Sequence, residues 1–258
     1  AVNDPPILSS SSIFIDEGAT FTLTTSEIFI TDADDNLSDV NIAISNLSST
    51  LSIQIAGSPV TSFTGQQLTD GNVSLVHDGS EDSTVFFDLT AEDGDEDLST
   101  PLTQSVFVSV TPVNDAPVIG SQTGTTVLEN SGNTSTSVGS ISATDVDDPS
   151  LTYSITNGNA SGFFTIAPST GNITLTTAGT AEVNQDNLVT TTYTLEITVA
   201  DDETPTPAST TTTLDVTFEA VNDPPILSSS SIFIDEGATF TLTTSEIFIT
   251  DADDNLSD

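Results

Sequence analysis

Residues 193–199 read Tyr-Thr-Leu-Glu-Ile-Thr-Val, an uninterrupted alternation of apolar and polar side chains. Because successive side chains of a β-strand point to opposite faces, this period of two predicts a strand with one buried face. The same alternation returns at 51–55, 106–110 and 214–218, in runs dominated by Thr, Val, Ile and Phe, which favour strands. No stretch of useful length has the period of a helix, so we predict an all-β chain.

Turn-forming residues separate the predicted strands, as at 57–59 (Gly-Ser-Pro), 70–72 (Asp-Gly-Asn) and 157–159 (Asn-Gly-Asn). We expect about seven strands in each unit of about 110 residues, which is the size and rhythm of an immunoglobulin-like sandwich. The predicted fold is therefore a tandem of seven-stranded immunoglobulin-like β-sandwiches joined end to end.

The chain also repeats itself. Residues 1–39 return without a change as residues 220–258, and Val-Asn-Asp occurs at 2–4, 113–115 and 221–223, each time with a proline within two residues. Such periodicity indicates a tandem array, of which this chain is expected to be a window. The predicted parts are an incoming linker at 1–4, a sandwich at 5–113, a second sandwich at 116–221 and the truncated start of the next copy at 224–258. We expect that last part to be frayed or to borrow a neighbour, because it cannot close a core alone.

The charge of the chain is one-sided: 39 acidic residues, one histidine and no lysine or arginine give a formal net charge of −39. This charge excludes nucleic acid and anionic membrane surfaces as partners. Only cations can supply the counter-charge, and calcium suits fixed carboxylates because it takes six to eight oxygen ligands. The absence of cysteine excludes disulfides, zinc–thiolate sites and thiol nucleophiles, and favours a bacterial surface over an animal one.

Acidic and amide side chains gather at four kinds of place that recur along the chain. They are an Asn-Asp pair in each linker, a Glu at the start of a first strand (Glu17, Glu129, Glu236), an Asp-x-Asp motif after the second strand, and an acid that closes a late strand (Asp93, Asp202). Loops at the ends of neighbouring sandwiches can meet at a junction, where several carboxylates stay ionised together only with a cation. The alternative is that these residues form ordinary solvated turns.

Residues 117–223 resemble a cadherin domain along their whole length. Leu-Glu-Asn near the start, ATDVDDPSLTYSI, FFTIAPSTGNITL, YTLEITVADD and the closing Val-Asn-Asp follow one another in the family's order. Residues 5–115 resemble the related proteoglycan-type cadherin-like repeat, with FTGQQLTDGNVSLVHDGSEDSTVFFDLTAEDG as the recognisable core. Strings of such units joined by VNDAP or VNDPP are typical of very large bacterial surface adhesins of the repeats-in-toxin kind.

The resemblance implies calcium ligands, because the matching positions of cadherins hold calcium between successive domains. The implied ligands of the first junction are Glu17, Asn114, Asp115, Asp145, Asp147 and Asp202. Those of the next are Glu129, Asn222, Asp223, Asp251 and Asp253, and those of the incoming linker are Asn3, Asp4, Asp32, Asp34 and Asp93.

The chain departs from the family at several positions. The extra linker Asp and Asn of the family are replaced here by Pro112, Ala220, Ala116 and Pro224. The mid-domain Leu-Asp-Arg-Glu motif is absent, and Glu182 and Asp186 are two candidate substitutes for its acids. The resemblance implies three ions in each junction, but one or two fit this ligand set as well.

These observations favour a calcium-stiffened extender segment of a giant extracellular adhesin, which projects a distal binding domain from the cell surface. The segment is expected to be monomeric, to contact neighbouring repeats of its own chain and not to insert into a membrane. The alternative is a module that itself binds a partner or self-associates, although the sequence shows no exposed aromatic cluster to mark such a surface.

An enzyme is the least favoured class. The only histidine, His77, alternates with Val73 and Leu75 and is expected to point into the domain as a packed structural residue. No nucleophile-elbow pattern accompanies it. We therefore expect no catalytic residues.

Overall fold

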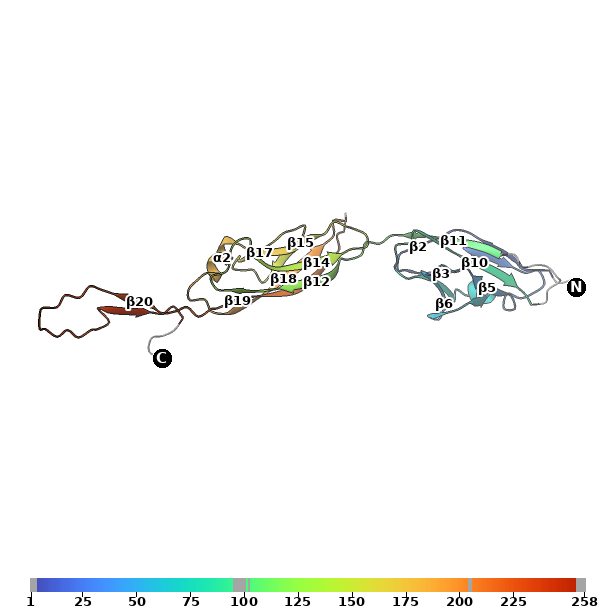
Figure 1. Cartoon of the computed structure of the whole chain (residues 1–258). Helices are drawn as coiled ribbons and strands as arrows, with labels where there is room; N and C mark the ends of the chain where they lie inside the picture. The colour runs from blue at the N-terminus through green and yellow to red at the C-terminus, as the bar shows by residue number, and fades with distance from the viewer. Residues whose placement is uncertain (1–3, 95–100, 102, 204–205, 254–258) are drawn as a thin grey trace. The chain divides into compact units, whose positions relative to one another are not determined.

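The computed structural model describes residues 4–94, 101, 103–203 and 206–253. The chain divides into two compact units, Ala1–Val113 and Asn114–Asp258, which are described one at a time. In both units, nearly all of the regular secondary structure is β-strand (Figure 1). The predicted all-β class with sandwich sheets is confirmed.

The described residues of the N-terminal unit form three sheets. The largest has the order β2-β11-β10-β5-β8. Its strands are β2 (Ile13–Asp16), β11 (Thr103–Thr111), β10 (Thr84–Glu92), β5 (Asn41–Ser45) and β8 (Ser62–Thr64). A second sheet has the order β3 (Thr20–Leu23), β9 (Val73–His77), β6 (Leu51–Ile55) and β7 (Ser58–Pro59). The third pairs β1 (Ile7–Ser10) with β4 (Ile28–Thr31).

The alternating apolar residues of these strands form one core. Leu23, Phe63 and Phe87 are fully buried in it, and each is the apolar member of an alternating pattern. One short helix, α1 (Gly65–Thr69), interrupts the strands, which the period of the sequence did not predict. Five residues are too few to show a helical period, but the Thr64 hydroxyl and the Gln67 side chain form a reciprocal capping box that starts the helix.

The C-terminal unit begins with a sandwich of two four-stranded sheets. The first has the order β12 (Val118–Gly124), β14 (Ser137–Thr144), β17 (Asn172–Leu175) and β16 (Phe164–Ile166). The second has the order β13 (Thr126–Leu128), β19 (Ser209–Glu219), β18 (Thr191–Ala200) and β15 (Thr152–Asn157). A helix of one to two turns, α2 (Thr177–Val183), follows β17 and starts at the capping residue Thr176.

Aromatic side chains fill the centre of this second sandwich. The rings of Tyr193 and Phe218 lie 5.1 Å apart between centroids at an interplanar angle of 62°. Phe164 lies 5.5 Å from Tyr193 and 5.6 Å from Phe218. Tilted and edge-on pairs at these distances are the favoured arrangement of aromatic rings, so the cluster fixes how the two sheets pack.

In each sandwich the second strand, here called the entering strand of the sheet that holds the last strand, pairs in parallel with that last strand. β2 pairs with β11, and β13 pairs with β19. The residue after each entering strand continues the ladder, since the N–H of Glu17 donates to the Thr111 carbonyl (2.9 Å) and that of Glu129 to the Glu219 carbonyl (2.8 Å). The topology thus carries Glu17 and Glu129, which directly follow β2 and β13, to the place where the chain leaves each domain.

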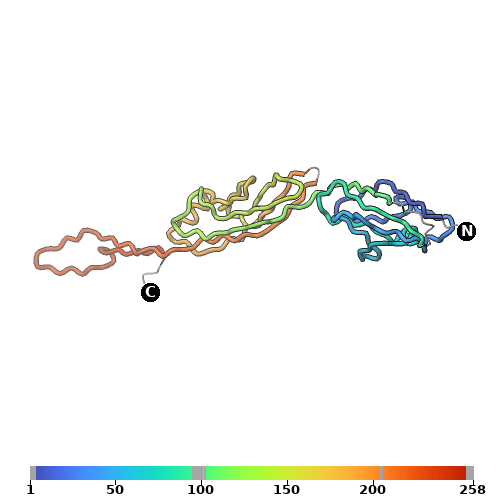
Figure 2. The backbone as a smooth tube through the Cα atoms, turned by 45° about the vertical axis from the view of Figure 1, so that its right-hand side comes forward, coloured from blue at the N-terminus to red at the C-terminus, as the bar shows by residue number. Residues whose placement is uncertain are grey.

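Residues 224–253 form no second layer (Figure 2). Only β20 (Ile226–Ser229) and β21 (Ile247–Thr250) pair, as a two-stranded sheet. Apolar side chains between them are exposed, among them Phe233 (92 %) and Leu242 (54 %). We expected this segment to be frayed or to borrow a neighbour; it forms a hairpin but buries no core of its own.

One surface contradicts the expectation that the chain lacks an exposed aromatic cluster. The side chains of Phe14, Phe86 and Phe107 are 71 %, 43 % and 56 % exposed. They belong to β2, β10 and β11, three neighbouring strands with β11 in the middle (Figure 1). Phe86 faces Phe107 across the two strands, with ring centroids 6.4 Å apart. The sequence alone did not identify this cluster, because Phe86 and Phe87 are adjacent and only the fold decides which one points outward.

Candidate metal centre

Each described linker aspartate is held by the Asp-x-Asp motif of its own unit. Its backbone N–H donates to the second carboxylate of that motif in all three copies of the linker. The bonds run from Asp4 to Asp34 Oδ1 (3.3 Å), from Asp115 to Asp147 Oδ2 (2.7 Å) and from Asp223 to Asp253 Oδ2 (2.5 Å). The sequence-predicted pairing of linker and motif therefore exists within each unit. Asn3, also predicted as a ligand, lies outside the described residues.

The first carboxylate of each motif shapes the turn that presents the second. Asp32, Asp145 and Asp251 each accept, through Oδ1, the backbone N–H two residues later, at 3.0, 2.9 and 3.1 Å. This is the local bond by which aspartate stabilises a turn. The other oxygens of Asp32 and Asp145, both named Oδ2, are buried and have no hydrogen-bond partner. A buried acceptor without a donor is unfavourable unless a cation or water meets it.

The glutamates after β2 and β13 reach the linkers. Glu17 Oε2 accepts the backbone N–H of Val113 (3.2 Å), and Glu129 Oε2 accepts that of Val221 (2.9 Å). Glu129 is only 5 % exposed, and its Oε1 accepts a further N–H from Leu188 (3.4 Å). Glu17 Oε1 is buried without a partner. The third glutamate of this series, Glu236, is exposed in a segment that has no strand.

Three carboxylates converge in the C-terminal unit. Oxygens of Glu129, Asp223 and Asp253 all lie within 4.8 Å of one another. Partial burial raises the pKa of the Asp223 carboxyl, and the charges of Asp253, Glu129, Asp186 and Asp251 raise it further, in that order. Like charges so close disfavour the ionised state, and a cation would reverse that effect.

The same cluster distinguishes the two candidate substitutes for the missing mid-domain motif. Asp186 is near enough for its charge to act on Asp223. Glu182 instead accepts the side-chain amide of Gln185 through Oε2 (2.6 Å), on the last turn of α2. The geometry therefore favours Asp186 as the additional acid of this site.

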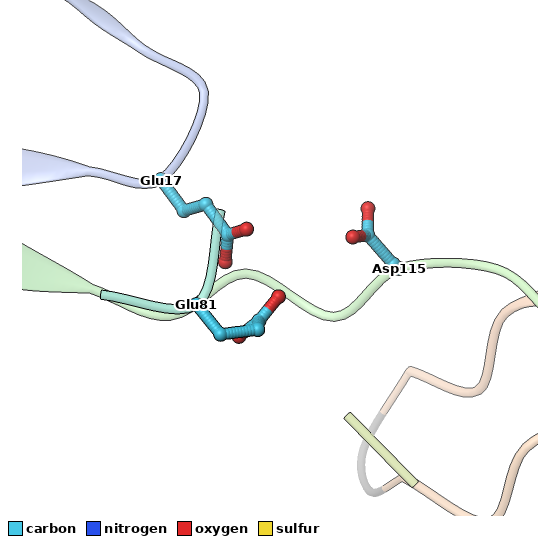
Figure 3. Close-up of side chains that lie close together, drawn as sticks. All are labelled: Glu17, Glu81 and Asp115. Carbon is cyan, nitrogen blue, oxygen red and sulfur yellow. The ribbon is translucent and has the colours of Figure 1, made fainter. Parts of the chain in front are cut away.

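The N-terminal unit has a second pair of acids at the end that carries Val113. Carboxylate oxygens of Glu17 and Glu81 lie within 4.8 Å of each other (Figure 3). Asp115, drawn in the same figure, belongs to the next unit and is held there by Asp147 as described above. Sequence reasoning missed Glu81, since it lies in a loop after β9 with no periodic pattern to orient it.

Asn114 has its side chain fixed by the C-terminal unit. Its Nδ2 donates to Asp201 Oδ2 (3.0 Å) and to the Thr206 carbonyl (3.4 Å). Its Oδ1 is buried and has no partner. Asn222, by contrast, donates to the carbonyl of Asp223 (3.0 Å). The amide oxygen of Asn114 is thereby oriented as an acceptor.

Asp201 is a further site residue, although the sequence pattern was interpreted in favour of Asp202. Asp201 is 5 % exposed and accepts the backbone N–H of Ala208 through both oxygens (3.1 and 3.0 Å), besides the Asn114 amide. Asp202 instead faces Asp148, whose Oδ2 accepts the Asp202 N–H at 3.2 Å. The signal was present, because Asp201 continues the buried alternation of Leu195, Ile197 and Val199, whereas Asp202 does not.

The two carboxyls of the Asp148–Asp202 pair have pKa values shifted in opposite directions. A side-chain hydrogen bond from Asp202 and a backbone bond from Ser150 lower the pKa of Asp148. The same side-chain bond, followed by the charge of Asp148, raises the pKa of Asp202. The pair therefore titrates as a unit, with a proton retained between the two carboxyls more readily than on an isolated aspartate.

Asp93, predicted as a ligand, follows Leu89 and Ala91 on the buried face of β10 and so occupies the position that Asp201 occupies after β18. Asp251 and Asp93 both interact with other groups of the chain. His77 is 1 % exposed, and its Nδ1 accepts the N–H groups of Gly18 (3.4 Å) and Gly79 (3.3 Å). The prediction that His77 points into the domain is confirmed.

The donor set of these sites consists of carboxylate, amide and backbone oxygens, and no lysine or arginine exists to neutralise them. Oxygen-only sites of this kind suit hard cations, and the variable spacing suits calcium better than the strict octahedron of magnesium. Buried unpaired oxygens of this kind occur in each unit taken by itself: Glu17 Oε1 in the N-terminal unit, and Asn114 Oδ1 and Asp145 Oδ2 in the C-terminal unit.

Comparisons with known proteins agree with the architecture. Residues 124–219 match the model of the cadherin domain, and residues 5–110 match a cadherin-like model. Human Protocadherin Fat 1 is 32 % identical over 193 residues, which are 71 % of this chain but 4 % of that protein. The chain thus spans a small part of this relative's length.

Solved structures show the same fold. Human Protocadherin-24 EC1-2 (Form II) superposes with a TM-score of 0.52 at 18 % identity, covering 85 % of this chain and 100 % of that one. Human CDH23 EC21-23 gives 0.50 at 19 % identity, covering 98 % of this chain and 81 % of that one. Cadherin domains are non-enzymatic, extracellular adhesion modules that typically bind calcium, which agrees with the expectation of no enzyme. Among the described residues, no helix has the length and apolar character needed to cross a bilayer.

Proposed function

Because the chain carries two tandem cadherin-like domains, we propose that it is a calcium-stiffened extender segment of a larger extracellular adhesin. In this role it holds a distal binding domain away from a cell surface and has no catalytic task. The repeated Val-Asn-Asp linkers and the absence of cysteine support a bacterial adhesin of the repeats-in-toxin kind as the parent protein.

One observation carries the proposal: buried oxygens without hydrogen-bond partners recur at the linkers of a chain that has no lysine or arginine. They are Glu17 Oε1, Asp32 Oδ2, Asn114 Oδ1 and Asp145 Oδ2. Each belongs to a residue whose other polar atoms are fixed by hydrogen bonds, so the unpaired oxygen is held in place. Carboxylate and amide oxygens that are held in place without a donor are the ligands that a bound calcium ion takes.

Calcium would supply the charge that these residues lack. The chain's own groups position the ligands: the Asp-x-Asp turns hold one carboxylate oxygen each, and Glu129 fixes the linker at Val221. Without the ion, the carboxylates of Glu129, Asp223 and Asp253 repel one another. Calcium binding therefore stabilises the ordered conformation of the linker. The free energy of binding opposes bending of the linker, because bending would separate the ligands from the ion.

Three consecutive residues of the linker, 113–115, are each held by a hydrogen bond to one of the two units. Val113 is held by Glu17 of the N-terminal unit, and the next two residues, Asn114 and Asp115, are held by Asp201 and Asp147 of the C-terminal unit. No flexible spacer separates these attachments. An ion bound to Asn114 and Asp147 would strengthen the attachment of the linker to the C-terminal unit.

Small-angle X-ray scattering of the whole chain, with millimolar calcium and then with chelator, tests the proposal. We expect chelation to broaden the distribution of distances within the particle. Calorimetric titration should show saturable calcium binding, and Asp145→Asn should weaken it by roughly tenfold or more, because ligand charge sets calcium affinity.

The matched control is Asp39→Asn, which removes one charge from an exposed aspartate of the N-terminal unit outside the clusters. It should leave calcium affinity unchanged. Identical scattering curves with calcium and with chelator would overturn the extender role. If the two substitutions weakened calcium binding equally, the binding would depend only on the net charge of the chain and not on a specific site.

A second candidate function is a module that binds a partner directly. The exposed side chains of Phe14, Phe86 and Phe107 favour it. The two functions are compatible, since an extender can also carry a binding face.

A further inference from the structure

The exposed phenylalanines lie on one face of the sheet β2-β11-β10. In its register, Phe86 is opposite Phe107 and Phe14 is opposite Ser109. Ser109 is two residues from Phe107 on the same face, so Phe14 and Phe107 are diagonal neighbours, within reach of aromatic side chains. We call Phe14, Phe86 and Phe107 the phenylalanine face.

The fold itself does not require these aromatic residues. Alignment through the parallel ladder, where Glu17 corresponds to Glu129, places Thr126 at the position of Phe14 and Asp215 at that of Phe107. The partner of Asp215 across the strands is Thr194, which corresponds to Phe86. Those three residues are exposed, and Thr194 donates its hydroxyl to Asp215 (2.6 Å).

The second sandwich thus builds the same face from polar side chains. A phenylalanine side chain that stays exposed to water contributes no hydrophobic stabilisation to the fold. Three such side chains at adjacent positions of the first sandwich therefore indicate a partner that covers them. Aromatic side chains are also the residues that most often carry the binding energy of interfaces.

The surroundings of the phenylalanine face are anionic. Asp16, which is exposed, follows Phe14 by two residues on the same face of β2. Asp88 follows Phe86 in the same way on β10 and is 8 % exposed. The Ser105 hydroxyl (2.6 Å) and the Asn46 amide (2.7 Å) donate to Asp88. These two bonds lower the pKa of the Asp88 carboxyl, so it stays charged beside the rings.

We propose that the phenylalanine face binds an arginine-bearing segment of another protein. Guanidinium groups stack on aromatic rings, whose faces are electronegative, and the flanking carboxylates add attraction of the same sign. The whole chain, at −39 with no lysine or arginine, steers a cationic partner toward it. A second copy of the chain is disfavoured as the occupant, because it carries the same large negative charge.

The test uses two probes of equal charge, a hexa-arginine and a hexalysine peptide, with the whole 258-residue chain. The variant is F14T/F86T/F107T, which conserves charge and keeps strand-favouring residues at each position. The control is F233T/F240T/F248T, which removes three other phenylalanines, 92 %, 44 % and 56 % exposed, that lie outside this face. Thermal unfolding verifies that both variants are folded.

Fluorescence anisotropy at physiological salt should show tighter binding of hexa-arginine than of hexalysine. The triple variant F14T/F86T/F107T should weaken hexa-arginine binding about tenfold and leave hexalysine binding almost unchanged, since three exposed cation–π contacts are lost. The control variant should bind both peptides as the unmodified chain does. Resonances of labelled Phe14, Phe86 and Phe107 should shift on addition of hexa-arginine.

Equal binding of the two peptides by the unmodified chain would overturn the proposal, and so would equal effects of the two triple variants. Sedimentation of the peptide-free chain examines the rival occupant: concentration-dependent association that F14T/F86T/F107T abolishes would assign the face to a second copy instead. Each measurement is made with calcium in excess and with chelator. Failure of the calcium proposal would leave the comparison of the variants intact.

Discussion

Residues 7–34 and 226–253 have the same amino-acid sequence but different structures. Both form the outer hairpin in the same register, with Ile7 opposite Thr31 and Ile226 opposite Thr250. In the first copy, two further strands form at 13–16 and 20–23, whereas the second copy has no strand at 232–235 or 239–242. The difference separates what this sequence encodes locally from what it obtains through tertiary contacts.

The local part includes the turn before the second hairpin strand. Glu27 accepts the N–H and hydroxyl of Thr24 (3.0 and 2.8 Å), and Glu246 accepts those of Thr243 (2.9 and 2.7 Å). The tertiary part is the pairing of β2 with β11 and of β3 with β9, which join segments far apart in the chain. Half of the strands in this segment therefore depend on residues outside it.

The largest expected effect comes from giving the second copy its missing partners. Appending the sequence of residues 40–113 after Asp258 should turn 232–235 and 239–242 into strands. Amide hydrogen exchange in these segments should slow by at least about a hundredfold, because opening would then require unfolding of a sandwich. A scrambled extension of the same composition is the control, and unchanged exchange with the native extension would contradict the comparison.

The next largest effect is a difference between equivalent core substitutions. Leu23 is fully buried, whereas its copy Leu242 is 54 % exposed. Leu23→Ala should lower the free energy of unfolding of the N-terminal unit by about 2–5 kcal/mol, and Leu242→Ala should change stability by less than about 0.5 kcal/mol. Urea unfolding measures both, and equal losses would mean that the second copy is buried in solution.

Replacement of the equivalent glycines of the two copies by alanine should strain the backbone in the same way. Only the replacement in the first copy should lower the stability of a folded unit. Gly18 and Gly237 have φ angles of +65° and +74°, where a Cβ atom is disfavoured. Gly18→Ala should lower the stability of the N-terminal unit by roughly 1–2 kcal/mol. Gly237→Ala should leave the melting of both sandwiches unchanged, and calorimetry distinguishes these outcomes.

The smallest effect is a pH dependence of the second copy's turn. Hydrogen bonds from the hydroxyl and backbone N–H of Thr243 lower the pKa of Glu246 below its ordinary value of 4.5. A depressed acid pKa stabilises the turn at pH above the ordinary value, and this contribution is lost as the pH falls through the depressed one. Resonances of Thr243 should follow that titration, and Glu246→Gln should abolish it.

Much of the fold could be predicted from the sequence, because a period of two identifies the buried face of strands such as β18 and β19 directly. The short helices α1 and α2 could not, since five to seven residues carry too little periodicity. Their capping residues Thr64 and Thr176 are the only local signals.

The site was predictable where it is local. Asp-x-Asp turns such as Asp145/Asp147 are held by a hydrogen bond between residues two positions apart. The conformation of these turns therefore follows from the local sequence. Glu81 reaches Glu17 only through the fold, and no spacing indicates it. Asp201 was missed although the alternation through Val199 marks it as buried, which shows that the period of a strand should be followed past its last apolar residue.

The parallel pairing of β2 with β11 and of β13 with β19 has a mechanical consequence. Tension applied along the chain pulls β2 and β11 in opposite directions along their length, and it acts on β13 and β19 in the same way. Hydrogen bonds between such strands are loaded in shear, so several must break at once instead of opening one after another. In each sandwich, this strand pair near the chain ends therefore resists separation under tension. The time for which the sandwich stays folded under load depends on the rate of unfolding and not on the equilibrium stability.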